Sequence, residues 1–238
     1  MRKLKRDACI GIVGKRGTGK STLVFDILHR FRRIPLGLAM SESEGANDAY
    51  ARIIPRNFIY EEYNDKAVNH LLKYQKCQKM QNNCDKEMTP CAFLVVDDCM
   101  TNKRWHNTKS VKTIFKNGRH YNIFSIFVMQ YALDIPAELR GCLDYIFIFK
   151  DNMRLNRQRI FQHYAGVFEN LHEFCRVFDK LTEDYHCMVI DNTSKSNNAE
   201  DVIFYYKADQ DKADTPFKMG CRDFWNYDPQ SDNHSINA

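Results

Sequence analysis

The stretch that decides the fold reads Gly14-Lys15-Arg16-Gly17-Thr18-Gly19-Lys20-Ser21. It matches the pattern G-x-x-x-x-G-K-[ST] in full, which is typical of a loop that holds the phosphates of a nucleotide. The apolar run 8–13 precedes it and predicts a buried strand, whereas residues 21–33 carry apolar side chains at helical spacing. The motif therefore lies between a predicted strand and a predicted helix, which is the context that it requires.

The residues of this loop predict a site for ATP and Mg²⁺. Glycines let the backbone curl so that its amide groups point at phosphate oxygens. We expect Lys20 to reach the β- and γ-phosphates, Ser21 to ligate Mg²⁺ and Thr22 to contact the α-phosphate. The expected nucleotide-binding residues are Gly14, Lys15, Arg16, Gly17, Thr18, Gly19, Lys20, Ser21 and Thr22. The alternative is a glycine-rich turn with a solvated lysine.

A second motif reads Phe93-Leu94-Val95-Val96-Asp97-Asp98 and has the form of a Walker B element. We expect Asp97 to hold the shell of the Mg²⁺ ion. Asp98 stands where many ATPases place a glutamate that polarises the attacking water, and its shorter side chain requires a closer approach or a second water. A strand followed by an acidic turn is the alternative.

Three further residues are candidates for catalysis. Gln130 is the first polar residue after a strand-like apolar run and is expected to sense the γ-phosphate or orient water, with simple strand capping as the alternative. Arg119 and Arg140 are each a candidate for the arginine that a neighbouring subunit inserts into the site. Either arginine could instead form a surface ion pair. The predicted catalytic set is Lys20, Asp98, Gln130, Arg119 and Arg140.

Short apolar strands that alternate with helical patterns predict an α/β protein with parallel βαβ units. The predicted strands are 8–13, 36–40, 58–60, 92–96, 123–129 and 145–149. Residues 154–178 predict two helices with a break near Gly166, and the strand-like runs 187–190 and 202–206 predict a β-hairpin. We expect residues 1–208 to form one ATPase domain and residues 209–238 to form a polar tail.

Composition limits the class of protein only loosely. The 238 residues carry a net charge of +5, which does not by itself indicate a nucleic-acid partner. The nine cysteines form no C-x-x-C pair and are interpreted as reduced, and a zinc site of Cys77, Cys84 and Cys91 is a minor alternative. No apolar run approaches the roughly 20 residues of a membrane helix, so we expect no membrane partner.

The placement of charge is more informative than its sum. Between Cys99 and Leu133 there is no Asp or Glu, and the same stretch holds six basic residues together with Trp105. A basic segment next to Walker B favours contact with a DNA backbone, and a solvated face or an acidic protein partner are the alternatives. The basic residues are Lys103, Arg104, Lys109, Lys112, Lys116 and Arg119, and a second cluster is Arg154, Arg157 and Arg159.

Taken together, these motifs resemble the genome-packaging ATPases of nucleocytoplasmic large DNA viruses, in the FtsK–HerA division of P-loop ATPases. The resemblance covers about residues 8–208. Its more specific carriers are Asn117-Gly118-Arg119-His120-Tyr121 and the hairpin from Val189-Ile190-Asp191-Asn192-Thr193 to Tyr205-Tyr206-Lys207-Ala208. Asp98 departs from the glutamate that is common in the wider division.

The resemblance implies a P-loop NTPase core with an additional strand and a mostly parallel sheet flanked by helices. It also implies a homo-oligomeric ring that pumps double-stranded DNA into a capsid, with capsid or portal components as partners. The expected location is then the virion and the viral factory in the host cytoplasm. A HerA-like helicase or translocase and a nucleotide-dependent switch that binds a capsid protein are the alternatives.

Overall fold

The computed structural model describes residues 4–82, 89–99 and 105–227. Within these residues one sheet of eight strands has the order β3-β2-β4-β5-β1-β6-β7-β8. The strands are β1 (Cys9–Val13), β2 (Leu36–Ser41), β3 (Ile59–Tyr60), β4 (Ala92–Asp97), β5 (Ile123–Met129), β6 (Tyr145–Phe149), β7 (His186–Asp191) and β8 (Ile203–Lys207).

The first six strands are parallel to one another, β7 pairs antiparallel with β6, and β8 pairs antiparallel with β7. Strand β5 lies between β1, which precedes the phosphate loop, and β4, which carries the acidic motif. The predicted additional strand and the predicted C-terminal hairpin are therefore both confirmed.

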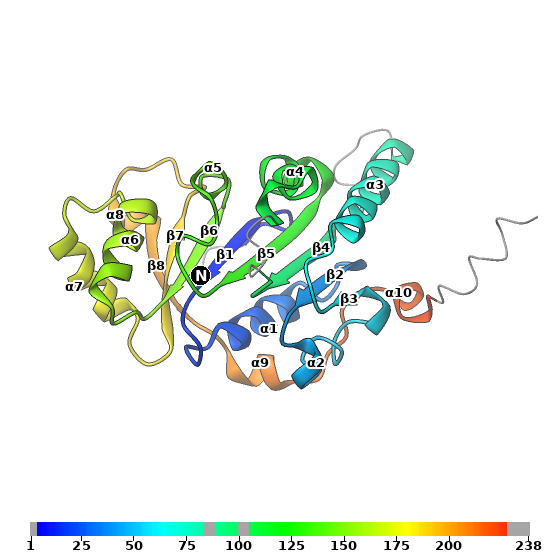
Figure 1. The fold of residues 1–238 in the computed structure, drawn as a ribbon, viewed down its shortest axis with the longest axis horizontal. Coiled ribbons are helices and arrows are strands. Elements are labelled where there is room, and N and C mark those ends of the chain that lie inside the picture. Colours follow the sequence, from blue (N-terminus) through cyan, green and yellow to red (C-terminus); the bar gives the residue numbers. More distant parts are fainter. Residues whose placement is uncertain (1–3, 83–88, 100–104, 228–238) are drawn as a thin grey trace, which may run out of the picture.

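Helices cover both faces of the sheet (Figure 1). The helices are α1 (Lys20–Arg30), α2 (Glu44–Asn47), α3 (Asp65–Gln81), α4 (Lys109–Asn117), α5 (Ala137–Arg140), α6 (Arg154–Tyr164), α7 (Leu171–Leu181), α8 (Ala199–Val202), α9 (Gln210–Asp214) and α10 (Arg222–Asn226). Apolar residues of α1 pack on one face with the C-terminal segment, and those of α3, α4, α6 and α7 pack on the other. Burial on both faces explains why the central strands are almost continuously apolar.

The C-terminal segment differs from the predicted polar tail. Residues 209–227 form α9, which packs beside α1, and α10, which lies near β3 (Figure 1). Phe217, Met219 and Phe224 are buried in the same core cluster as the α1 side chains. Three apolar side chains spread over eight residues lack a clear period, so the sequence pattern does not reveal their burial. Residues 228–238 of the predicted tail lie outside the described residues.

Candidate nucleotide-binding site

The register of the central strands brings the two motifs to one edge of the sheet. Val13 at the end of β1 pairs with Met129 of β5, and Asp97 at the end of β4 pairs with Val128. The amide of Gly14 donates to the carbonyl of Met129 over 3.1 Å, and the amide of Asp98 donates to that of Val128 over 3.2 Å. The loop, the acidic pair and the residue that follows Met129 therefore emerge side by side. Ligands of open α/β sheets bind at such carboxyl ends.

The loop has the backbone that its glycines permit. Gly17 and Gly19 have φ angles of 77° and 99°, in the left-handed region that favours glycine. Gly14 has a different reason to lack a side chain, because an added Cβ would lie 2.7 Å from Oγ1 of Thr18 and 2.9 Å from Cβ of Phe149. Helix α1 begins at Lys20, so its positive N-terminal end faces the loop.

The ammonium group of Lys20 lies between the phosphate loop and the acidic motif. Its Nζ donates to the carbonyl of Lys15 over 3.0 Å, and Oγ1 of Thr18 donates to the same carbonyl over 2.8 Å. Burial lowers the pKa of Lys20, and the nearby carboxylates of Asp98 and Asp97 oppose that effect. A cation in this position complements a polyphosphate.

Lys15 differs from the other predicted nucleotide-binding residues because its side chain turns away from the loop. Its Nζ forms an ion pair with Asp151 over 2.8 Å. Burial disfavours the carboxylate of Asp151, yet hydrogen bonds from Lys15, from the amide of Met153 and from Asn156 hold the pKa of Asp151 below its ordinary value. Lys15 thus anchors the loop to the segment after β6, and only its backbone stays available to a phosphate.

The acidic pair is held by residues from other parts of the chain. The hydroxyl of Tyr50 donates to Oδ2 of Asp97 over 2.8 Å, and the carboxylate of Glu44 accepts the amides of Tyr50 and Ala51 over 2.9 and 2.8 Å. Burial raises the pKa of Asp97, whereas the bond from Tyr50 lowers it. The sequence gives no sign of Tyr50 as a site residue, since it is one of twelve tyrosines and lies in no motif.

Asp98 and Gln130 are brought into direct contact, because Nε2 of Gln130 donates to Oδ2 of Asp98. Asp98 adopts a φ of 56°, an uncommon conformation for a non-glycine residue that often marks a functional position. The structure thus brings together two residues that were predicted separately, and their catalytic roles stay predictions. An amide beside a carboxylate is an arrangement that orients a water molecule.

A cavity of about 660 Å³ joins these groups. It is lined by Arg16, Gly17, Gly19, Lys20, Ser21, Thr22, Ser43, Asn47, Asp97, Asp98, Gln130, Tyr185, Lys207, Ala208 and Gln210. Most of the predicted nucleotide, metal and catalytic residues thus share one cavity. The sequence did not predict that Tyr185, Lys207, Ala208 and Gln210 would line this cavity. These residues lie far from the loop along the chain and belong to no phosphate-binding pattern.

The donor set fits Mg²⁺ rather than a transition metal. Ser21 and Asp97 offer a hydroxyl and a carboxylate at the same cavity, and Mg²⁺ is usually bound through one or two carboxylates together with substrate phosphates. In the described parts of the chain no three His, Cys, Asp or Glu side chains are grouped to hold a metal. Of the alternative zinc set, Cys77 and Cys91 form no disulfide, and Cys84 lies outside the described residues.

Neither predicted arginine finger reaches the cavity of its own chain. Arg119 precedes β5 and forms an ion pair with the buried carboxylate of Asp144, which also accepts the amide of Cys9 over 2.9 Å. Cys9 begins β1, whereas the loop follows its last residue, so this ion pair lies at the opposite edge of the sheet. Arg140 donates through Nε to the carbonyl of Ile135 over 2.7 Å. The ion-pair interpretation therefore holds for Arg119, and a role in a neighbouring subunit stays a prediction for both.

The basic segment after Walker B differs in part from its prediction. Trp105 is only 2% exposed and packs against Phe127 and Phe115, so it belongs to the core and is not available to stack on a base. Lys109 and Lys116 of α4 are exposed, and Lys112 forms an ion pair with Glu138 over 3.2 Å. Lys103 and Arg104 lie outside the described residues.

The second basic cluster is not a uniform solvated face. Arg157 forms an ion pair with Asp179 over 2.5 Å, and Arg154 is exposed. Arg159 lines a small hollow together with Gly14, Gln130 and Asp151, beside the phosphate loop. Helical spacing alone could not separate these three roles.

Comparison with known proteins places the chain in a family. A model described as "Poxvirus A32 protein" matches residues 2–219. The chain belongs to the Poxvirus A32 protein family. Protein L437 of Acanthamoeba polyphaga mimivirus is 32% identical over 229 residues, which cover 94% of this chain and 79% of that protein. Protein 075L of Invertebrate iridescent virus 6 is 35% identical over 224 residues, which cover 93% and 84%.

The fold has a solved counterpart. The genome packaging NTPase B204 from Sulfolobus turreted icosahedral virus 2, in complex with AMP, superposes with a TM-score of 0.58 at 16% identity and covers 87% of this chain and 100% of that one. The predicted resemblance to viral genome-packaging ATPases is thus confirmed, by the matching family model and by the similar fold. No helix within the described ranges is long and apolar enough to span a bilayer.

Proposed function

We propose that the protein is the ATPase of a viral DNA-packaging motor, which hydrolyses ATP and moves double-stranded DNA into a capsid. The observation that carries the proposal is the single cavity shared by Lys20, Ser21, Asp97, Asp98 and Gln130. Membership of the Poxvirus A32 family supports the viral setting, and B204, of similar fold, is a genome packaging NTPase that was solved with ATP-gammaS.

Each residue has a role that follows from its position. Lys20 and the loop amides neutralise the phosphates. Ser21 and Asp97 would hold a Mg²⁺ ion, which would supply further positive charge beside the γ-phosphate. Asp98 accepts a proton from the attacking water, which Gln130 orients because its amide already contacts that carboxylate. Tyr50 fixes the carboxylate of Asp97 for the metal.

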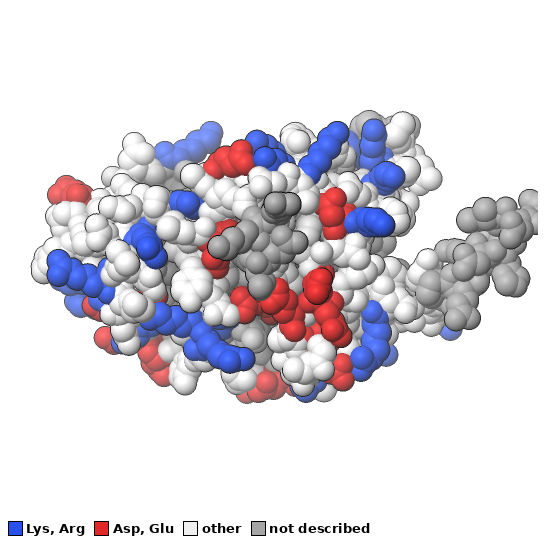
Figure 2. All heavy atoms as spheres, in the orientation of Figure 1, with Lys and Arg blue, Asp and Glu red and all other residues white. Residues whose placement is uncertain are grey.

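The DNA surface that we propose lies on the edge formed by α3 and α4. Figure 2 shows Lys and Arg side chains along this edge, with Asp and Glu gathered nearer the middle of the same face. In the sequence, α4 begins eleven positions after Asp98, and we propose that a movement at the acidic motif is passed on to Lys109 and Lys116. Exposed lysines that bind phosphates would make DNA binding fall with rising salt.

A ring of identical subunits completes this proposal. Among the described residues, Arg16 of the phosphate loop is the one arginine that lines the cavity. An arginine that stabilises the transition state would then come from a neighbour, with Arg140 the better candidate because Arg119 is engaged by Asp144. Capsid or portal partners and a location in the virion and the viral factory follow from the packaging role.

The test is ATP hydrolysis measured with and without double-stranded DNA. We expect DNA to stimulate phosphate release by the wild type, and Lys20→Ala to abolish release in both conditions. Replacing Lys109 and Lys116 with Ala should reduce the salt dependence of DNA binding by a slope of about 2, since each lost phosphate contact removes roughly 0.9. The matched control is Lys195→Ala, on an exposed loop far along the chain.

Hydrolysis that is indifferent to DNA would contradict the motor and favour a nucleotide-dependent switch. Strand separation by the protein alone would favour a helicase. Turnover that survives in Lys20→Ala would exclude the proposed site altogether.

A further inference from the structure

One wall of the cavity has no role in binding phosphate or metal. It is formed by Tyr185, just before β7, and by the segment Lys207–Gln210, which ends β8 and begins α9. Tyr185 is 65% exposed although it is a large aromatic residue. Its ring lies beside the loop, since a Cβ added to Gly19 would be 3.7 Å from its Cδ1. The ring therefore borders the cavity next to the start of α1.

The backbone before β7 holds this ring in place in a conformation that is strained for non-glycine residues. Asp184 and Tyr185 have φ angles of 47° and 58°, two successive non-glycine residues in the left-handed region. The carboxylate of Asp184 forms an ion pair with Lys207 over 2.5 Å, and the amide of His186 donates to the carbonyl of Glu183 over 3.0 Å. The turn is thus tied to the end of β8 while its aromatic ring is left open to the cavity.

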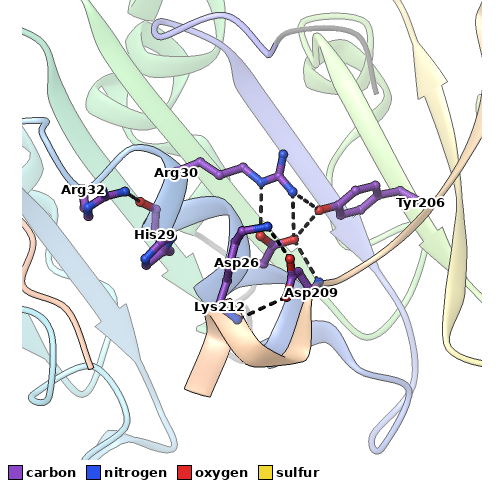
Figure 3. A network of polar contacts seen from close by, with 7 residues as sticks. All are labelled: Asp26, His29, Arg30, Arg32, Tyr206, Asp209 and Lys212. Atoms are coloured by element: carbon purple, nitrogen blue, oxygen red, sulfur yellow. Dashed lines mark hydrogen bonds and ion pairs between the residues drawn. The ribbon is translucent and has the colours of Figure 1, made fainter. Parts of the chain in front are cut away.

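The same wall is fixed to helix α1 by the network shown in Figure 3. Asp26 of α1 is fully buried, and its carboxylate accepts Nε of Arg30 over 3.1 Å, the hydroxyl of Tyr206, and the amide of Asp209 over 3.2 Å. Lys212 in turn pairs with the carboxylate of Asp209. Because α1 also begins at the phosphate loop, the loop and the wall are positioned by one helix.

From this arrangement we propose that Tyr185 is the platform on which the base of the bound nucleotide stacks. The inference rests on the proposed nucleotide function and adds the subsite for the base. A nucleotide whose phosphates lie on the loop has its base beyond the start of α1, and Tyr185 offers the exposed aromatic face in the cavity there. Stacking between a base and an aromatic side chain is a common mode of recognition.

The polar side chains of this wall are already engaged, which leaves the ring as the recognising group. Lys207 is paired with Asp184, and Nε2 of Gln210 donates to Asp214 over 2.8 Å. Tyr185 is then a binding residue that touches the base, whereas Asp26 is a positioning residue that acts through Tyr206 and Asp209.

The experiment compares the binding of a magnesium complex of ATP-gammaS with that of inorganic triphosphate, which lacks a base. The variant is Tyr185→Asn, because asparagine tolerates the left-handed backbone and removes the ring. We expect ATP-gammaS to bind about 5- to 150-fold more weakly, the range that corresponds to the usual free energy of base stacking, and triphosphate binding to stay unchanged. Tyr185→Phe should bind both ligands like the wild type, since the ring is retained.

The matched control is Tyr205→Asn. Tyr205 has the same exposure of 65% and lies on β8, but it does not line this cavity, so its loss should leave both ligands unaffected. An equal loss of ATP-gammaS and triphosphate in Tyr185→Asn would overturn the proposal by showing a general effect on the loop. Unchanged binding of ATP-gammaS would overturn it by placing the base elsewhere. A wild-type protein that binds neither ligand would instead overturn the nucleotide function itself.

Discussion

At the scale of single residues, Arg119 has a different role in the structure from the one that the sequence suggests. The segment Gly118-Arg119-His120 suggests an arginine that acts on a neighbour's ATP, yet the side chain neutralises a carboxylate that is 0% exposed within its own chain. Asp144 ties β1 to the start of β6, because its carboxylate accepts the amide of Cys9 and its amide donates to the carbonyl of Cys9 over 2.7 Å. A buried carboxylate that loses its partner is strongly destabilising.

We therefore predict that Arg119→Ala lowers the free energy of unfolding by about 2 kcal/mol, a value reduced from that of fully buried pairs because the arginine is half exposed. The matched variant Arg140→Ala loses a bond to one backbone carbonyl and should cost about 1 kcal/mol or less. Denaturant unfolding of both variants checks this. Arg119→Ala with unchanged stability and lost turnover would restore the arginine-finger interpretation.

At the scale of elements, a partly buried polar cluster joins α3 to α4. Asp65, in the first turn of α3, accepts hydrogen bonds from Ser110 of α4, from the hydroxyl of Tyr63 over 3.1 Å and from Asn69 over 3.0 Å. Burial disfavours the charged form, but these bonds outweigh it and lower the pKa of Asp65. The cluster fixes α4, which carries the proposed DNA-binding lysines.

The predicted consequence is a stability that depends on pH. A carboxylate with a lowered pKa in the folded state stabilises the protein above its ordinary pKa of about 3.9, and the contribution is lost as pH falls through the lowered value. Asp65→Asn should therefore be about 1 kcal/mol less stable than the wild type at pH 7, with the difference shrinking below about pH 4. Denaturant unfolding curves of the wild type and Asp65→Asn at pH 7 and below pH 4 measure this difference. Glu183→Gln, which changes an exposed side chain, is the control. A difference that does not vary with pH would contradict it.

Much of the element order could be predicted because the strands are short and apolar and each chemical motif follows one directly. The phosphate loop, Asp97, Asp98 and Gln130 lie together as expected, since the carboxyl ends of parallel strands share one edge, and their roles stay predictions. Tyr50 and Tyr185 could not be found, because their proximity to the site depends on tertiary packing and not on local spacing. The ion pair of Lys15 with Asp151 could not be predicted either, because it joins the loop to a residue far along the chain.

At the scale of the whole molecule, the C-terminal segment is part of the domain. Phe224 of α10 is 5% exposed, and its ring centroid lies 4.3 Å from that of Phe58 and 6.2 Å from that of Phe93. The segment thus covers the β2–β3 end of the sheet, while Gln210, near its start, lines the nucleotide cavity. Nucleotide binding and folding of this segment should therefore be linked.

Phe224→Ala should lower the free energy of unfolding by about 3–4 kcal/mol, as is usual when a buried phenylalanine is truncated. Met153→Ala removes an apolar side chain that is 55% exposed and should cost less than about 0.5 kcal/mol. Thermal and denaturant unfolding of the two variants measure this contrast. Equal and small effects would support the polar-tail interpretation instead.

The central claim is that hydrolysis in this cavity moves the protein along duplex DNA, and displacement of a third strand from a DNA triplex tests it most directly. The account predicts that the wild type displaces the strand only with Mg²⁺ and ATP. Asp98→Asn should bind nucleotide and DNA but displace nothing, because the attacking water loses its base. ATP hydrolysis stimulated by DNA without any displacement by the wild type would contradict the claim that this protein is a DNA motor.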